Sequence, residues 1–91
     1  MNVAERFGRN LFMCRRRAGL SQGQLAARAA LHRTEIGLLE SGRRTARVDT
    51  LMKLTGALEA DPRDLLRGIE WQPVESERFH ASGWVRPIQR P

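Results

Sequence analysis

Arginine is the side chain that dominates the binding chemistry available to this 91-residue sequence. It supplies fifteen of the sixteen basic residues, which outnumber the ten acidic residues and give a formal net charge of +6. A guanidinium donates hydrogen bonds in a planar fork that matches phosphate oxygens and guanine edges, whereas lysine is a point charge. Ten of the arginines, against three glutamates, lie in residues 1–47. The sequence therefore predicts a polyanionic partner, nucleic acid in particular, for the first half of the chain.

The sequence offers no arrangement of side chains suited to catalysis. It has no paired carboxylates in a helical frame, no Cys/His or Ser/His arrangement and no glycine loop that would cradle a phosphate. His32 and His80 have no partners at metal-ligand spacing. The single cysteine, Cys14, falls on an apolar stripe and is expected to be a small buried hydrophobe rather than a redox switch. We therefore expect no enzyme, no metal site and no cofactor.

The length predicts a single compact unit with a tail. The longest stretch without a charged residue, residues 18–27, is too short to span a membrane, and residues 1–10 lack the apolar run of a secretory signal. We therefore expect a cytoplasmic protein without a membrane partner. A domain this small is marginally stable by itself, which favours a homodimer.

Residues 3–69 have the pattern of five short helices and no clear strand. Apolar residues at spacings of three and four run from Val3 to Ala18, and Gly19 follows as a helix end. Ser21 and Gln24 form a capping-box pattern that opens a second helix. The third helix is expected over residues 33–41. Those expected to face inward from these three helices are Val3, Phe7, Leu11, Cys14, Ala18, Leu25, Ala26, Ala29, Ile36 and Leu39.

Two further helices are expected in residues 48–69. Asp61 can cap the second of these, with Pro62 at its first position and Asp64 in its first turn. The inward-facing residues predicted for this pair of helices are Val48, Leu51, Leu54, Leu58, Leu65, Leu66 and Ile69.

Three segments between residues 20 and 42 share the register of a DNA-binding family: Leu20-Ser21-Gln22-x-x-Leu25-Ala26, Leu31-His32-Arg33-Thr34-Glu35-Ile36 and Leu39-Glu40-x-Gly42. With them the chain resembles the helix-turn-helix family of phage repressors, Cro proteins and their bacterial relatives, over about residues 6–68. The resemblance implies an all-α, five-helix, lambda-repressor-like domain whose third helix lies in the major groove. Residues 31–37 also resemble controller proteins of restriction-modification systems.

The resemblance implies that the start of the third helix reads bases. Arg33 is expected to fork onto guanine O6 and N7, the alternative being a phosphate contact that only anchors. Thr34 can bond a base or touch a thymine methyl group, with Leu38 one turn further on. Glu35 can accept from cytosine N4, although a stabilising charge at the helix start is its favoured role.

Four residues are expected to contact phosphates. Gln22 is similar to the family glutamine that bonds a phosphate and braces the recognition helix, the alternative being ordinary helix-start chemistry. Arg43, Arg44 and Arg47 follow the third helix without an acidic residue between them, which favours backbone contacts over a solvated charge run.

Other positions have implied structural roles or depart from the family pattern. Arg15 and Glu40 match a partly buried ion pair of the family, which joins the first helix to the end of the third. This pair orients the helices and does not read bases. Ala30 stands at the turn where the family usually has glycine, so either the turn is wider or Ala30 adopts a left-handed conformation. Gly23 and Gly37 lie inside expected helices, which calls for close packing or close approach of DNA.

We divide the chain into a helix-turn-helix DNA-binding domain, residues 1–70, and a C-terminal tail, residues 71–91. The tail holds three of the four prolines and three of the five aromatic residues. Residues 69–72 and 83–86 alternate weakly, which suggests a short strand or hairpin. We expect the large apolar residues of the tail to pack on the last two helices or on a second subunit, the alternative being a flexible tail. They are Trp71, Val74, Phe79, Trp84, Val85 and Ile88.

The function expected from these features is sequence-specific binding of double-stranded DNA by a transcriptional regulator or repressor. It would bind a near-palindromic operator as a homodimer, with two recognition helices about 34 Å apart. The alternative is an antitoxin-like DNA-binding protein whose tail, residues 71–91, contacts another protein.

Overall fold

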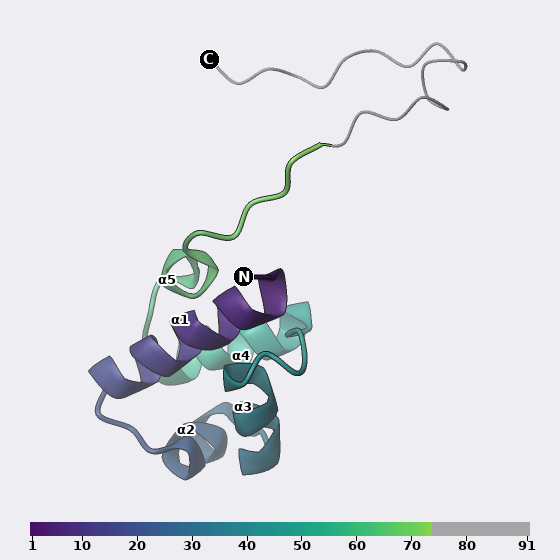
Figure 1. The fold of residues 1–91 in the computed structure, drawn as a ribbon. Coiled ribbons are helices and arrows are strands. Elements are labelled where there is room, and N and C mark those ends of the chain that lie inside the picture. The colour runs from purple at the N-terminus through teal and green to yellow at the C-terminus, as the bar shows by residue number, and fades with distance from the viewer. Residues whose placement is uncertain (74–91) are drawn as a thin grey trace, which may run out of the picture.

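The computed structural model describes residues 1–73, which form five α-helices and no strand. The all-α, five-helix fold expected from the sequence is confirmed. In Figure 1, α2 and α3 lie together on one side of α1, and α5 packs against its other side. None of the helices in residues 1–73 has the length and hydropathy of a membrane span. The helices are α1 (Val3–Arg17), α2 (Gln22–Ala29), α3 (Arg33–Glu40), α4 (Val48–Leu58) and α5 (Pro62–Leu66).

Short polar caps fix where the helices begin. Ser21 and Gln24 make the predicted capping box at the start of α2, because the Ser21 hydroxyl accepts from Gln24 N–H at 3.1 Å and Gln24 Oε1 accepts from Ser21 N–H at 2.8 Å. The Asp61 carboxylate accepts from the Arg63 N–H at 2.8 Å at the start of α5, also as predicted. His32 caps α3 with no side-chain hydrogen bond. The start of α3 therefore keeps its backbone donors uncapped by a side chain.

All five helices contribute to one hydrophobic core. Ala26 is buried in it, as expected for the small residue where α2 and α3 cross. Every helix supplies at least one side chain with no exposed surface, so α3 is held by packing as well as by its ends. These side chains are Leu11, Leu25, Ile36, Leu39, Leu54 and Leu65.

Four of the residues expected to face inward are exposed. Val3 and Val48 are the first residues of α1 and α4, Leu66 is the last residue of α5, and Ala18 follows α1 as its C-cap. Val48 is 78% exposed and Leu66 41%. Helical spacing assigned them to the correct stripe, but no neighbouring helix covers these helix ends. The prediction that they are buried was therefore wrong.

The tail is described only as far as Pro73. Trp71 is 77% exposed, so within this chain it does not pack on α4 or α5 as expected. Residues 69–72 are irregular and form no strand. The remaining residues for which packing or strand pairing was expected, Val74, Phe79, Gly83, Trp84, Val85, Arg86 and Ile88, lie outside the described residues.

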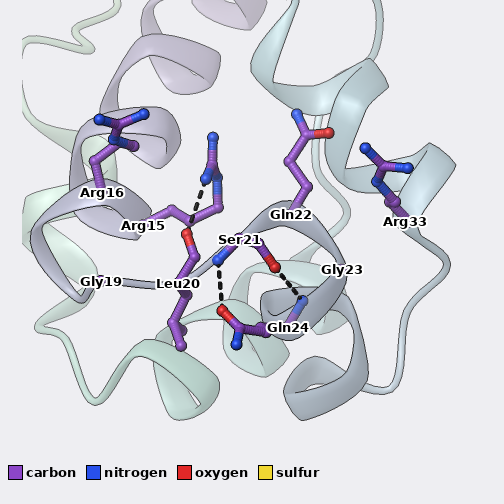
Figure 2. Close-up of a pocket in the computed structure, with 9 residues that line it drawn as sticks. All are labelled: Arg15, Arg16, Gly19, Leu20, Ser21, Gln22, Gly23, Gln24 and Arg33. Atoms are coloured by element: carbon purple, nitrogen blue, oxygen red, sulfur yellow. Dashed lines mark hydrogen bonds between the residues drawn. The ribbon is translucent and has the colours of Figure 1, made fainter.

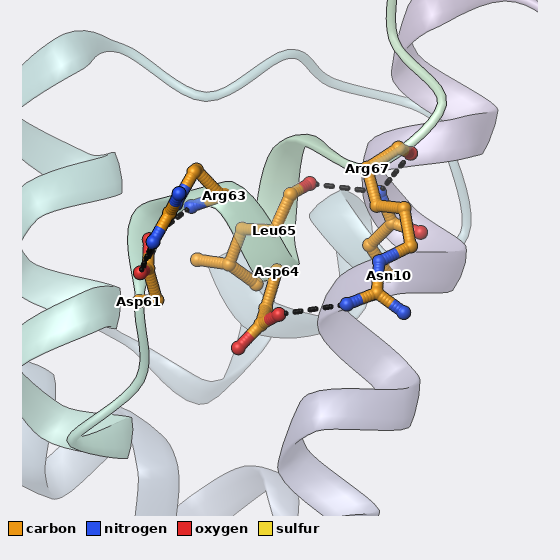
Figure 3. A network of polar contacts seen from close by, with 6 residues as sticks. All are labelled: Asn10, Asp61, Arg63, Asp64, Leu65 and Arg67. Carbon is orange, nitrogen blue, oxygen red and sulfur yellow. Dashed lines mark hydrogen bonds and ion pairs between the residues drawn. The ribbon is translucent and has the colours of Figure 1, made fainter.

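Two residues that the sequence analysis did not single out position α1 against its neighbours. Gly8 lies where α1 crosses the end of α3: a Cβ atom there would be 2.3 Å from the Leu39 carbonyl oxygen and 2.6 Å from that of Glu40. Asn10 is buried and its amide donates to the carbonyl oxygens of Leu65 and Arg67 at 2.8 and 2.9 Å (Figure 3). These contacts fix α3 and α5 on opposite parts of α1.

The turn between α2 and α3 is tight. Ala30 adopts the left-handed conformation, with φ 55° and ψ 44°, and the Leu31 N–H donates to the Ala26 carbonyl oxygen at 2.9 Å. The wider turn considered for the sequence does not occur. Ala30 instead adopts a left-handed backbone conformation, which costs about 1 kcal/mol for a residue with a Cβ atom.

Candidate nucleic-acid interface

The start of α3 is presented to solvent. Arg33 and Thr34 are both exposed in its first turn, whereas Ile36 and Leu39 on the opposite side are fully buried. Glu35 and Leu38 are half-buried. Of the four residues predicted to read bases, the structure therefore leaves Arg33 and Thr34 most accessible.

A polar hollow separates the end of α1 from the start of α3. Its volume is about 800 Å³, and it is lined by Arg15, Arg16, Gly19, Leu20, Ser21, Gln22, Gly23, Gln24 and Arg33. Figure 2 shows the side chains of Arg15, Arg16, Gln22 and Arg33 extending to the same side of the molecule. This surface, called here the cationic hollow, brings Gln22 and Arg33 together from α2 and α3.

A buried polar network fixes the far end of α3. Arg15 Nε donates to Glu40 Oε2 at 2.6 Å and Arg15 Nη2 to Glu40 Oε1 at 3.0 Å. Only 8% and 6% of these two side chains is exposed. Hydrogen bonding to Glu40 raises the pKa of Arg15 above its ordinary value, against the opposing effect of burial. The pair is therefore a buried ionic link between α1 and the last residue of α3.

Gln22 extends this network to the start of α2. Its Nε2 donates to Glu40 Oε1 at 3.1 Å, and Arg15 Nη1 donates to the Leu20 carbonyl oxygen at 2.9 Å. A carboxamide carries two N–H donors, so Gln22 can bond Glu40 and an anion at the same time. The first residue of α2 and the last of α3 are thus joined through one carboxylate.

The arginines after α3 lie in the exposed segment that leads to α4. Arg43, Arg44 and Arg47 are all exposed. Arg47 Nε lies 3.3 Å from Asp49 Oδ1, with 83% and 58% of the two side chains exposed, so this ion pair contributes little to stability. In residues 1–73, Arg43 and Arg44 form no ion pair. These guanidinium groups are available to an external anion.

The stacking of Arg16 was missed by the sequence analysis. Its guanidinium lies 5.8 Å from the centroid of the Phe12 ring, and that of Arg15 lies 5.3 Å from the same ring. Such cation–π contacts orient an arginine beside an exposed aromatic ring. The spacing of three and four residues on α1 was the signal that could have revealed them.

The glycines of α2 and α3, Gly23 and Gly37, differ in their surroundings. A Cβ atom on Gly23 would lie 4.0 Å from Arg33 Cδ, an ordinary contact, so Gly23 has a packing neighbour. A Cβ atom on Gly37 would meet no protein atom within 4 Å. Each glycine costs its helix about 0.5–1 kcal/mol relative to alanine.

Cys14 is buried in the core cluster. Burial is the main cause that raises the pKa of its thiol above the ordinary value for cysteine, as expected for a buried hydrophobe. Among residues 1–73, no three His, Cys, Asp or Glu side chains gather where they could hold a metal ion.

A short helix packed through a tight turn against a second, exposed helix, beside a cationic surface, defines a helix-turn-helix DNA-binding domain. The sequence model of the family described as "Helix-turn-helix domain" matches residues 6–67, and the chain belongs to this family.

The comparisons also give individual relatives. The chain is 36% identical over 66 residues to the control protein C.BamHI of Bacillus amyloliquefaciens, covering 71% of this chain and 82% of that protein. It is similar in structure to the restriction-modification controller protein C.AhdI of Aeromonas hydrophila, with a TM-score of 0.66 and 37% identity over 68% of this chain and 94% of the other. The clp gene regulator ClgR of C. glutamicum gives a TM-score of 0.69 and 26% identity, over 72% and 86% of the two chains. These relatives are control and regulator proteins rather than enzymes, in agreement with the non-catalytic class expected from the sequence.

Proposed function

We propose that this protein is a transcriptional regulator of the controller type that binds a near-palindromic operator in double-stranded DNA as a homodimer. The observation that carries the proposal is the exposure of Arg33 and Thr34 at the start of a helix whose far end is fixed by the buried Arg15–Glu40 pair. A recognition helix needs exposed side chains at its start, and its other end must be held rigidly against the rest of the domain. The likeness to two control proteins supports the same function.

Sequence reading is assigned to the exposed face of α3. Arg33 forks onto guanine O6 and N7, a contact that discriminates by about 1–3 kcal/mol. Thr34 and Leu38 contact a neighbouring base or thymine methyl group. Glu35, half-buried in the first turn, acts mainly as a stabilising charge at the helix start and secondarily as an acceptor for cytosine N4.

Phosphate binding is assigned to the two sides of α3. Gln22 donates its second amide proton to a phosphate at the cationic hollow, and Arg43, Arg44 and Arg47 bind phosphates on the other side. Four phosphates per subunit give a slope of log K against log salt near −7 for the dimer. A slope close to zero would contradict electrostatic anchoring.

The surface proposed for the homodimer is an apolar groove away from the cationic hollow. It has a volume of about 140 Å³ and shares no residue with the hollow. We assign its occupant as a second copy of this chain, because Val48 and Leu66, which line the groove, remain 78% and 41% exposed as an apolar patch and the hollow stays open to DNA. The groove is lined by Val3, Phe7, Thr45, Ala46, Arg47, Val48, Leu51, Leu66 and Ile69. Arg47 keeps its proposed phosphate contact because 83% of its side chain is exposed, so its guanidinium can extend out of the groove.

Selection from randomised duplexes, with the mass of the protein measured in solution, tests this function. We expect an enriched motif with dyad symmetry and the mass of a dimer. A Val48→Asn variant, which adds no charge beside Arg47, should become monomeric and lose affinity for the paired half-sites while remaining folded. Failure of the wild-type protein to enrich any sequence would refute the proposal.

The alternative role, contact of residues 71–91 with another protein, is supported by the exposure of Trp71. Removing residues 71–91 separates the two roles. Under the regulator proposal the shortened protein still dimerises and binds its selected duplex. Loss of a co-purifying protein, with DNA binding intact, would instead assign the tail to that partner.

A further inference from the structure

Gly37 occupies the middle of α3, where glycine weakens a helix. α3 has eight residues and no side-chain cap at its N-terminus, so its intrinsic helix stability is low and it depends on packing. A glycine in this position calls for a reason that outweighs the loss of helix stability.

The fold itself gives no such reason. Gly8 is required because a Cβ atom there would overlap the Leu39 and Glu40 carbonyl oxygens, and Gly42 has a φ of +75°. Gly37 has neither feature: its φ is not positive, and a Cβ atom would lie more than 4 Å from any other protein atom. Neither close packing nor backbone conformation accounts for Gly37 or for Gly56 in α4, so what sets Gly37 apart is the surface on which it lies.

The position of Gly37 on the helix indicates what it faces. It follows Arg33 by four residues and Thr34 by three, so the three residues share one side of α3. The fully buried Ile36 and Leu39 point into the core on the other side. The surface around Gly37 is therefore a continuation of the surface that carries Arg33 and Thr34.

We propose that Gly37 is the point of closest approach between α3 and the base-pair edges of the major groove. The proposal rests on the proposed function and deepens it. Without a side chain at this point the α3 backbone lies deeper in the groove, so Arg33 and Thr34 reach base edges. A methyl group at residue 37 would hold the helix away from the floor of the groove and weaken the base contacts of the preceding turn.

The test compares Gly37→Ala with Gly56→Ala. Gly56 is a matched control: it lies within α4, is exposed, and would bring its Cβ atom within 4 Å of no other protein atom. Both substitutions should raise the midpoint of thermal unfolding by a few degrees, because alanine favours the helix. The probe is the duplex that the wild-type protein enriches from a randomised pool.

We expect Gly37→Ala to lower affinity for this duplex about tenfold or more and Gly56→Ala to leave it unchanged. Binding of both variants to a scrambled duplex at low salt should equal that of the wild type, since it depends on phosphate contacts. Two results would overturn the assignment: wild-type affinity of Gly37→Ala for the enriched duplex, or a lower unfolding midpoint, which would make the glycine a requirement of the fold. Neither result affects the proposed function, which the enrichment of a duplex by the wild-type protein supports independently. If the wild-type protein enriches no sequence, the proposed function is refuted and the role of Gly37 with it.

Discussion

Arg15 and Glu40 form a bidentate ion pair that joins α1 to the last residue of α3, with donor–acceptor distances of 2.6 and 3.0 Å. Gln22 donates to the same carboxylate from the start of α2. One buried acidic group thereby sets the position of both helices of the helix-turn-helix unit relative to α1. The pair positions α3, and of the residues proposed to contact DNA, Gln22 bonds to it directly.

Arg15→Met tests the importance of this pair. It leaves the Glu40 carboxylate buried without its cation, which should lower the free energy of unfolding by about 3–5 kcal/mol. Arg67→Met is the matched control, because Arg67 pairs with Asp64 while 73% of the Arg67 side chain is exposed, and its effect should stay within about 1 kcal/mol. Urea unfolding of both variants measures the difference. Equal effects would show that the Arg15–Glu40 pair behaves as a surface contact.

Gly8→Ala tests the crossing of α1 and α3. The added methyl group would overlap two backbone oxygens at the end of α3, so the helices must separate, at a cost of about 1–3 kcal/mol. Gly56→Ala, in open surroundings, should instead stabilise by about 0.5–1 kcal/mol. Unfolding free energies of opposite sign are expected. A stabilised Gly8→Ala variant would rule out the close crossing.

Ala30→Gly tests the turn between α2 and α3. Glycine removes the cost of the left-handed backbone at φ 55°, so stability should rise by up to about 1 kcal/mol. Ala27→Gly, at an exposed helical position in α2, should lower stability by about 0.5–1 kcal/mol. Thermal unfolding of the two variants distinguishes the positions. A loss of stability in both would indicate that Ala30 is not left-handed in solution.

Asp61 gives the chain a measurable response to acid. The side chain of Arg63, and then its backbone N–H, lower the pKa of Asp61 from 3.8 to about 2 (Figure 3). Since the folded form binds this proton less tightly than the unfolded chain does, the contribution of the α5 cap is complete above pH 3.8 and is lost as the pH falls through about 2. An NMR titration of the Asp61 carboxyl group should show the low midpoint, and Arg63→Met should raise it. A midpoint near 3.8 in the wild type would contradict the contact.

Local chemistry made much of the fold predictable. The Ser21–Gln24 capping box and the Asp61-Pro62 start of α5 formed as expected because their hydrogen bonds join residues close in sequence. The burial of Ile36 and Leu39 followed from helical spacing. These features set the bounds of the helices and the exposed face of α3.

The remaining features depend on contacts between distant segments. Gly8 was missed because only the crossing of α3 over α1 gives it a role, and Asn10 because its partners are the backbone oxygens of Leu65 and Arg67. Burial of Val48 was predicted wrongly because spacing does not tell where a neighbouring helix ends. At the candidate site, the sequence indicated the residues at the start of α3, and the resemblance implied that Gln22 braces α3. That its partner is Glu40 required the structure.

Base selection by Arg33 variants tests the central claim most directly. Selection from randomised duplexes should show that Arg33→Ala loses the preference at one base position in each half-site and keeps the others, whereas Arg43→Ala weakens binding to all sequences alike. Arg33→Lys keeps the charge but loses the guanidinium fork, so it should also lose that preference. An unchanged motif in Arg33→Ala, with reduced affinity for every duplex, would contradict the account, because Arg33 would then contact only phosphates.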